Sequence, residues 1–126
     1  MQPIGRSSFA PLFMQTVRIY KALQISKRQA LLREGFRSID FPFNPPYQDG
    51  SCYFAGPEDR SIAEEFNQSY RGGILEVAID RPAYEEHFKL LEYCYDVRDG
   101  RRRIEVVVPQ ELFPVLNEFP RVLKEK

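Results

Sequence analysis

Three short segments, far apart along the chain, constrain its fold more than any other feature. They cover residues 17–22 (VRIYKA), 50–55 (GSCYFA) and 103–109 (RIEVVVP). Each is rich in β-branched or aromatic residues, which favour strands, and each carries a polar or ionisable side chain. We therefore expect three strands that bring distant polar side chains to one cleft.

Helix and strand signals also mix in the remainder of the chain, without strict alternation. Capping residues, glycines and apolar spacing predict helices from Ser26 to Gly35, from Gly56 to Tyr70, from Asp80 to about Leu91, and from Pro109 onward. Strands are predicted over 73–79, 93–97 and 102–108, with a hairpin turn at Asp99-Gly100 and a charged tail over 124–126. This pattern favours an α+β fold with a largely antiparallel sheet and flanking helices.

A chain of 126 residues is long enough for one hydrophobic core, so a single domain is expected. Residues 1–15 lack periodicity and contain two prolines, which predicts an N-terminal arm ahead of a domain over 16–126. No apolar stretch approaches the roughly twenty residues that a membrane span requires. We expect no membrane association, and a protein that is cytoplasmic or is delivered to a target cell by a non-classical route.

Charge and metal-ligand content exclude several classes of protein. Eighteen basic residues balance eighteen acidic ones, so no overall field favours nucleic acid. With one histidine, His87, and two cysteines, Cys52 and Cys94, on predicted core elements, no metal site is expected. The one dense basic group flanks the predicted hairpin turn, where it is either solvated or grips a phosphate; it comprises Arg98, Arg101, Arg102 and Arg103.

Glu105 is the most informative single residue. Alternation along the last of the three segments places it on the face opposite Ile104, Val106 and Val108. A carboxylate on the open face of a sheet is commonly just solvated. The alternative is that Glu105 faces a site.

A proline-rich loop over 41–47 is expected to be irregular, because prolines remove hydrogen-bond donors and restrict the residues before them. Its three aromatic residues are Phe41, Phe43 and Tyr47. They either fill the core beneath the loop or form a wall on which a planar ring stacks.

The order of the three segments resembles that of the mono-ADP-ribosyltransferases, a similarity that extends from about Val17 to Val108. The resemblance implies a split antiparallel sheet that binds NAD as co-substrate. By that resemblance Lys21 falls at the first-strand cofactor position, Tyr53 at the second-strand aromatic position and Glu105 at the catalytic glutamate. Tyr53 would stack on nicotinamide, although an aromatic residue on a short strand is commonly only packing.

Other cofactor-binding candidates under this resemblance are Arg18, Tyr20, Phe54 and Phe43. Two positions differ from the family. Lys21 stands where members have histidine or arginine, and Arg103 stands where many have glutamine or glutamate. The second difference argues against an arginine side chain as the acceptor.

The chain is also similar to the RES-domain toxins that degrade NAD, in the segments Phe43-Asn44-Pro45-Pro46, Tyr53-Phe54-Ala55 and Ala63-Glu64. This adds Glu64 as a second candidate carboxylate, unless it is simply a surface residue of a helix. The two resemblances imply cleavage of the nicotinamide–ribose bond, with transfer to a macromolecule or to water, in a toxin or effector that has a cognate immunity or antitoxin protein. The alternative is a non-catalytic protein-binding module on the same fold.

Overall fold

The computed structural model describes residues 15–46, 48–94 and 102–125. The expected N-terminal arm therefore lies outside the described residues, except for Gln15. Tyr47 and the predicted Asp99-Gly100 turn also lie outside them, as do Arg98 and Arg101. Within the described part, the structure confirms an α+β domain built on an antiparallel sheet.

All neighbouring strands of the six-stranded sheet are antiparallel, in the order β6-β7-β4-β1-β5-β8. The strands are β1 (Thr16–Gln24), β4 (Cys52–Ala55), β5 (Arg71–Asp80), β6 (Glu92–Cys94), β7 (Ile104–Val108) and β8 (Arg121–Glu125). The three polar segments over residues 17–22, 50–55 and 103–109 thus form β1, β4 and β7. These strands are neighbours in the sheet, with β4 in the middle.

The prediction of a charged tail after the last helix was wrong. Residues 121–125 form strand β8, which pairs with β5 through Leu123 opposite Leu75 and Val122 opposite Glu76. Leu123 packs against the main core, whereas Val122 is 50% exposed and the remaining residues of the strand are charged. The segment therefore shows little of the apolar alternation that marks a half-buried strand.

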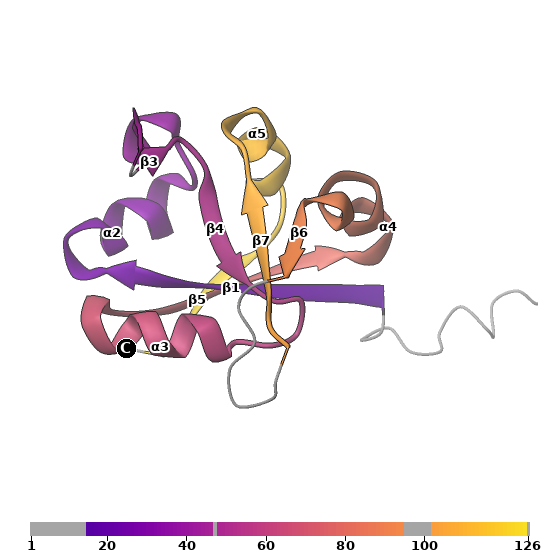
Figure 1. Cartoon of the computed structure of the whole chain (residues 1–126), viewed down its shortest axis with the longest axis horizontal. Coiled ribbons are helices and arrows are strands. Elements are labelled where there is room, and N and C mark those ends of the chain that lie inside the picture. Colours follow the sequence, from indigo (N-terminus) through magenta and orange to yellow (C-terminus); the bar gives the residue numbers. More distant parts are fainter. Residues whose placement is uncertain (1–14, 47, 95–101, 126) are drawn as a thin grey trace, which may run out of the picture.

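β1 pairs with its two neighbouring strands to very different extents. It pairs with β5 along nearly its whole length, from Thr16 opposite Asp80 to Gln24 opposite Arg71. With β4 it pairs only at Tyr20, which lies opposite Ala55. Figure 1 shows β1 and β5 lying across the view and β4 and β7 lying upright in it, so β1 and β4 diverge on one side of their contact.

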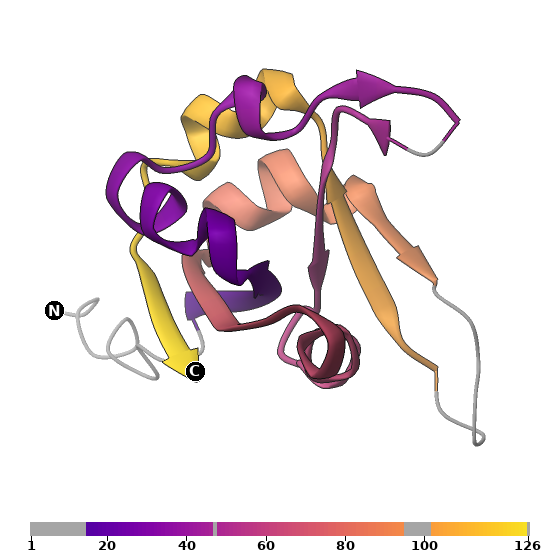
Figure 2. The ribbon, with the colours of Figure 1, turned by 90° about the vertical axis from the view of Figure 1, so that its left-hand side faces the viewer.

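The helices divide between the two faces of the sheet. They are α2 (Ile25–Glu34), α3 (Ser61–Tyr70), α4 (Arg81–Ala83) and α5 (Phe113–Leu116), with a π-helical turn at Tyr84–Phe88 and short 3₁₀ turns at Ser38–Asp40, Lys89–Leu91 and Gln110–Leu112. Helix α3 packs Ile62 and Ala63 on one face, against Tyr20, Ala55 and Ile74. The other helices cover the opposite face, where the main core lies, and Figure 2 shows α3 apart from them.

Two helix starts differ from the predictions. Ser26 does not cap α2, which begins at Ile25 with no side-chain cap. The second helix begins at Ser61 rather than near Gly56, because Glu58 adopts a positive φ of 61° and turns its carboxylate back to the backbone N–H of Arg18. These tertiary contacts hold residues 56–60 in a loop.

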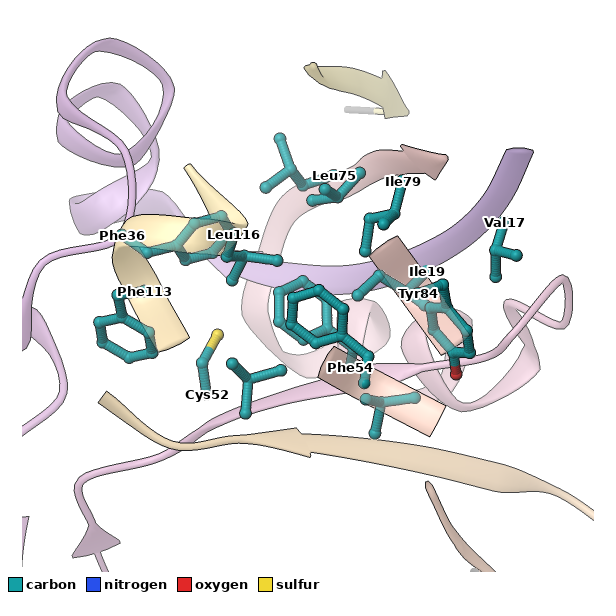
Figure 3. Packing of buried hydrophobic residues seen from close by; sticks show 14 of the residues in the cluster. Val17, Ile19, Phe36, Cys52, Phe54, Leu75, Ile79, Tyr84, Phe113 and Leu116 are labelled. Atoms are coloured by element: carbon teal, nitrogen blue, oxygen red, sulfur yellow. The ribbon is translucent and has the colours of Figure 1, made fainter. Parts of the chain in front are cut away.

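Aromatic rings dominate the main core. Phe54 of β4 is 1% exposed, and its ring lies edge-on to Phe36, with centroids 5.6 Å apart (Figure 3). Phe113 of α5 packs on Phe36 and on Phe41, so the partly buried Phe41 packs against the core. Each buried aromatic ring of this kind removes about 150–250 Å² of surface from water.

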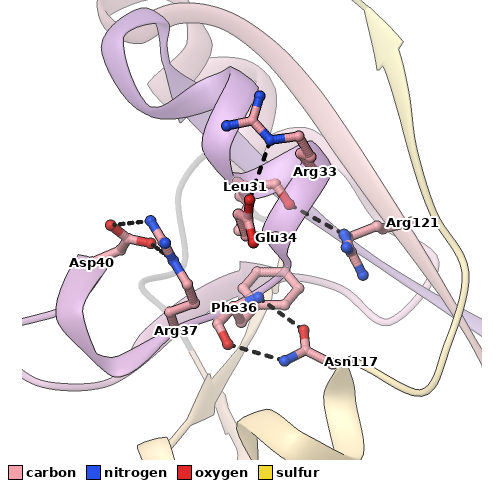
Figure 4. Close-up of polar contacts among 8 residues, drawn as sticks. All are labelled: Leu31, Arg33, Glu34, Phe36, Arg37, Asp40, Asn117 and Arg121. Atoms are coloured by element: carbon pink, nitrogen blue, oxygen red, sulfur yellow. Dashed lines mark hydrogen bonds and ion pairs between the residues drawn. The ribbon is translucent and has the colours of Figure 1, made fainter.

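The loop after α2 is tied to the end of the chain. Asn117 accepts a hydrogen bond from the Phe36 N–H (2.8 Å) and donates one to the Phe36 carbonyl (3.0 Å), while Arg121 donates to the Leu31 carbonyl (Figure 4).

Part of the proline-rich loop after α2 is regular, contrary to the prediction, because β2 (Phe43–Asn44) pairs with β3 (Gln48–Asp49). The Phe43 ring is 72% exposed, so it does not fill the core.

Candidate functional site

Two cavities flank the gap between β1 and β4. The first, of about 270 Å³, lies against α3 and is called the α3-side cavity; its lining includes Tyr20, Lys21, Tyr53, Phe66, Tyr70 and Glu105. The second, of about 220 Å³, lies against the start of α2 and is called the α2-side cavity; its lining includes Lys21, Gln24, Lys27, Phe41, Asp49 and Tyr53. Lys21, Ala22, Tyr53 and Tyr70 line both cavities, so the two adjoin.

Glu105 is a buried carboxylate, not a solvated one. It lies on β7 between Ala55 of β4 and Tyr93 of β6, and it is 8% exposed. Burial raises the pKa of Glu105 above its ordinary value, and the charge of Lys21 acts in the opposite direction. A carboxylate in such surroundings interacts strongly with any cation that enters the cavity, because little water screens it.

Tyr53 presents its ring to both cavities, and a hydrogen bond holds it there. The side chain is 42% exposed, and its hydroxyl donates to Oδ2 of Asp49 at 2.7 Å. This bond to a carboxylate is the largest cause that raises the pKa of Tyr53 to about 12. It also lowers the pKa of Asp49. The ring is therefore positioned rather than free to rotate.

Lys21 occupies the gap itself. Its Nζ lies 3.4 Å from the Tyr53 carbonyl oxygen, to which it donates, and 5.5 Å from the centroid of the Phe41 ring. Because β1 and β4 diverge just after Tyr20, the lysine side chain can line both cavities. Of the two first-strand cations predicted to bind the cofactor, Lys21 and Arg18, Lys21 lines the cavities.

Phe66 and Tyr70 belong to the site, although sequence reasoning did not propose either of them for it. Their rings are half-exposed on α3 and stack with centroids 5.9 Å apart, and both line the α3-side cavity. The helical spacing of Phe66 with Ile62 and Ala63 predicts a core position, but Phe66 is 41% exposed. The i, i+4 spacing of two aromatic residues was a signal that could have identified the pair.

Several predicted site residues lie elsewhere. Arg18 bonds Glu58 through its guanidinium at 3.3 Å and does not line either cavity. Glu64 is exposed on α3 beside Arg60, at 3.1 Å, and exposed Phe43 is in β2. Phe54 borders the α3-side cavity, but its buried ring leaves almost no surface for a ligand. Tyr20 lines that cavity and is largely buried.

The predicted basic group is not simply solvated. Arg103 is 3% exposed and bonds Glu65 of α3, while Arg102 is exposed. Arg103 therefore ties β7 to α3 beside Glu105. Of the two cysteines, Cys52 is buried, which raises the pKa of its thiol to about 11, and Cys94 is exposed, contrary to its expected place in the core.

Among residues 15–46, 48–94 and 102–125, no group of three or more histidine, cysteine, aspartate or glutamate side chains could hold a metal ion. In the same part of the chain, no helix has both the length and the apolar character needed to cross a membrane.

No protein-family model, curated protein or solved structure matches this chain.

Asp49→Asn is expected to lower the pKa of the Tyr53 phenol from about 12 toward its ordinary value of 10.0, because the amide no longer holds the phenolic proton against a negative charge. An NMR titration with ring-labelled tyrosine measures this shift. Asp40→Asn is the matched control, since Asp40 lines the same cavity but pairs with Arg37. An unchanged Tyr53 titration in Asp49→Asn would show that the bond is absent in solution.

Proposed function

We propose that this protein cleaves the bond between nicotinamide and ribose in NAD, and that its sheet is the split type found in ADP-ribosyltransferases. One observation carries the proposal. Lys21 of β1, Tyr53 of β4 and Glu105 of β7 line a single cavity, although they lie 32 and 52 residues apart. The three polar positions chosen from the sequence could equally have faced different sides of the sheet.

The proposed chemistry uses the buried carboxylate as an electrostatic catalyst. When the C1′–N1 bond breaks, its electron pair stays on the ring nitrogen, so neutral nicotinamide leaves and positive charge develops on the ribose. Glu105 stabilises this charge, which is absent from the ribose of the bound substrate. Water or a nucleophile of a macromolecular acceptor then attacks C1′ and releases its proton to solvent. Fixed groups of this kind typically contribute about 10²–10³ in rate.

The aromatic side chains supply the binding surface for the leaving ring. Tyr53 from β4 and Phe66 from α3 both line the α3-side cavity with half-exposed rings. Rings in such positions favour a planar, positively charged pyridinium through stacking and cation–π attraction. Lys21 offers a charged donor to the ribose hydroxyls or to the adjacent phosphate.

A second candidate function is supported by the loop between α2 and β4. Ile39 is 79% exposed and Phe43 is 72% exposed on it, and exposed apolar side chains of this size are common at protein–protein contacts. A binding module would use this surface and leave NAD intact.

Nicotinamide release decides between the two functions. Purified protein is incubated with NAD and the released nicotinamide is measured by chromatography, with and without a cell extract as a source of acceptors. We expect release above the background of a buffer control. If no nicotinamide is released under either condition, the enzyme proposal fails and the binding module remains.

The release rate is also expected to fall as the pH is lowered, because Glu105 must be ionised to stabilise the ribosyl cation. Burial raises its pKa, so the midpoint of this acidic limb lies above the ordinary value of 4.5. Lys21→Met removes a positive charge that lowers this pKa and should move the limb to higher pH. Rate profiles of the two proteins from pH 4 to pH 8 measure the shift. Superimposed profiles would contradict the assignment of this limb to Glu105.

A further inference from the structure

Glu105 is a buried carboxylate without a bonded partner among the residues that the structure describes. It is 8% exposed, and no hydrogen bond or ion pair joins it to any of them. The charge of Lys21 acts on it, but the Nζ of Lys21 donates to the Tyr53 carbonyl oxygen instead. Buried charged groups are usually paired, because burial removes the water that would otherwise stabilise the charge. Glu105 departs from this rule although a second cation lies close to it.

That cation is Arg103, which lies two residues before Glu105. Alternation along β7 places both side chains on the face of the sheet that α3 covers. Side chains at positions i and i+2 of a strand are roughly 7 Å apart, a distance that an extended arginine side chain can span. Arg103 is 3% exposed, so its charge is buried as well. Two opposite charges buried this close together would ordinarily pair with each other.

Glu65 of α3 binds Arg103 instead. The Arg103 guanidinium donates from Nη1 to Oε2 of Glu65, across 38 positions of the chain. The Glu65 side chain is 54% exposed, so it reaches Arg103 from the surface of the helix. Helix α3 is anchored on this face by the buried residues Ile62 and Ala63, which place Glu65 over β7 independently of the ion pair. The pair therefore directs the guanidinium toward α3 and away from Glu105.

The other charged and titratable side chains around Glu105 do not replace Arg103 as its partner. From the elements packed on this face they are Tyr20, Lys21, Tyr53, Arg60, Tyr70 and Tyr93. Arg60 pairs with Glu64 at 3.1 Å, and the Tyr53 hydroxyl donates to Asp49. The other tyrosines are phenols and supply no positive charge. Arg103 is therefore the cation whose position decides whether Glu105 stays unpaired.

We propose that Glu65 is a positioning residue, whose ion pair with Arg103 holds that cation on α3 and leaves Glu105 unpaired toward the α3-side cavity. If Arg103 paired with Glu105, its charge would oppose that of the carboxylate and its side chain would enter the cavity. This inference rests on the proposed function only for its effect on catalysis.

A titration of Glu105 tests the proposal without any turnover. Glutamate labelled with ¹³C at the side-chain carboxyl group is followed by NMR, and Glu105→Gln identifies the signal. In Glu65→Ala the pKa of Glu105 should fall below its wild-type value, because Arg103 turns to the only buried carboxylate within its reach. Glu65→Gln keeps the size of the side chain and should shift the pKa in the same direction. Glu65→Ala/Arg103→Met should abolish the fall.

Glu64→Ala is the matched control, because Glu64 is exposed on the same helix and pairs with a different arginine, Arg60. Its Glu105 titration should match wild type. The comparison separates the loss of the specific partner of Arg103 from the loss of any negative charge on α3.

Nicotinamide release provides the second readout. Glu65→Ala should lower kcat about tenfold or more at neutral pH, because a paired Glu105 stabilises the ribosyl cation less. The acidic limb of its rate profile should move to lower pH, opposite to the shift expected for Lys21→Met. Glu65→Ala/Arg103→Met should recover most of the lost rate, which a purely structural role of the ion pair would not allow.

The proposal would be overturned by an unchanged Glu105 titration in Glu65→Ala, or by an equal change in Glu64→Ala. It would also fail if the double variant titrated like Glu65→Ala, or if Glu65→Ala were slow while its Glu105 titration matched wild type. A shift of the expected direction in a protein that releases no nicotinamide would support the positioning role and refute the proposed reaction.

Discussion

Glu105→Gln is expected to slow nicotinamide release from NAD by about a hundredfold or more, while KM changes little. The amide keeps the size and the hydrogen-bonding capacity of the side chain but removes its negative charge. That charge matters only when the ribose becomes cationic, so the loss should fall on kcat. Initial rates of nicotinamide release over a range of NAD concentrations provide both constants.

The same substitution should not destabilise the protein. Because burial raises the pKa of Glu105, the folded state binds its proton more tightly than the unfolded state does. The stability contributed by Glu105 is therefore greatest below its unfolded pKa and is lost as the pH rises through the folded pKa. At neutral pH the ionised group is unfavourable in the fold, so Glu105→Gln should unfold at an equal or higher urea concentration than wild type.

Glu64→Gln provides the matched control, because Glu64 is exposed on α3 and does not line the α3-side cavity. It should release nicotinamide at the wild-type rate. If instead Glu64→Gln is slow and Glu105→Gln is not, the second carboxylate suggested by the sequence is the catalytic one. Equal rates in all three proteins would exclude both glutamates.

Phe54→Ala is expected to reduce the free energy of unfolding by about 3–5 kcal/mol, the usual loss when a large aromatic ring is removed from a packed core. The ring is 1% exposed and packs edge-on against Phe36. Such a loss is a large part of the roughly 5–15 kcal/mol that stabilises a typical domain. Urea unfolding followed by circular dichroism measures it.

Phe54→Leu separates the packing role of this residue from the cofactor role that the sequence suggested. Leucine keeps most of the buried apolar surface, so this variant should remain folded at 25 °C. Its KM for NAD should stay within threefold of wild type, because the Phe54 ring faces the core rather than a ligand. A folded Phe54→Leu protein with strongly weakened NAD binding would return Phe54 to the site.

Local sequence pattern was enough to predict the strands of the sheet centre. Alternation indicated β5 and β7, and β-branched and aromatic content indicated β1, because each of these strands buries apolar side chains on at least one face. Local pattern did not predict β8, because this edge strand has charged residues and an exposed Val122 and shows little apolar alternation. Local pattern also failed at residues 56–60. The contact between Arg18 and Glu58 joins residues 40 positions apart, so the sequence around Glu58 does not indicate it.

For the site, the sequence alone determined which polar side chains lie on strands, and on which face of β7 Glu105 stands. Only the tertiary structure decided that β1 and β4 pair at a single position and then diverge, so that Lys21 reaches both cavities. It also decided that Arg18 faces Glu58, that Phe54 packs in the core and that Phe66 and Tyr70 border the cavity. Strand alternation depends on neighbouring residues, whereas the crossing of two strands depends on everything packed around them.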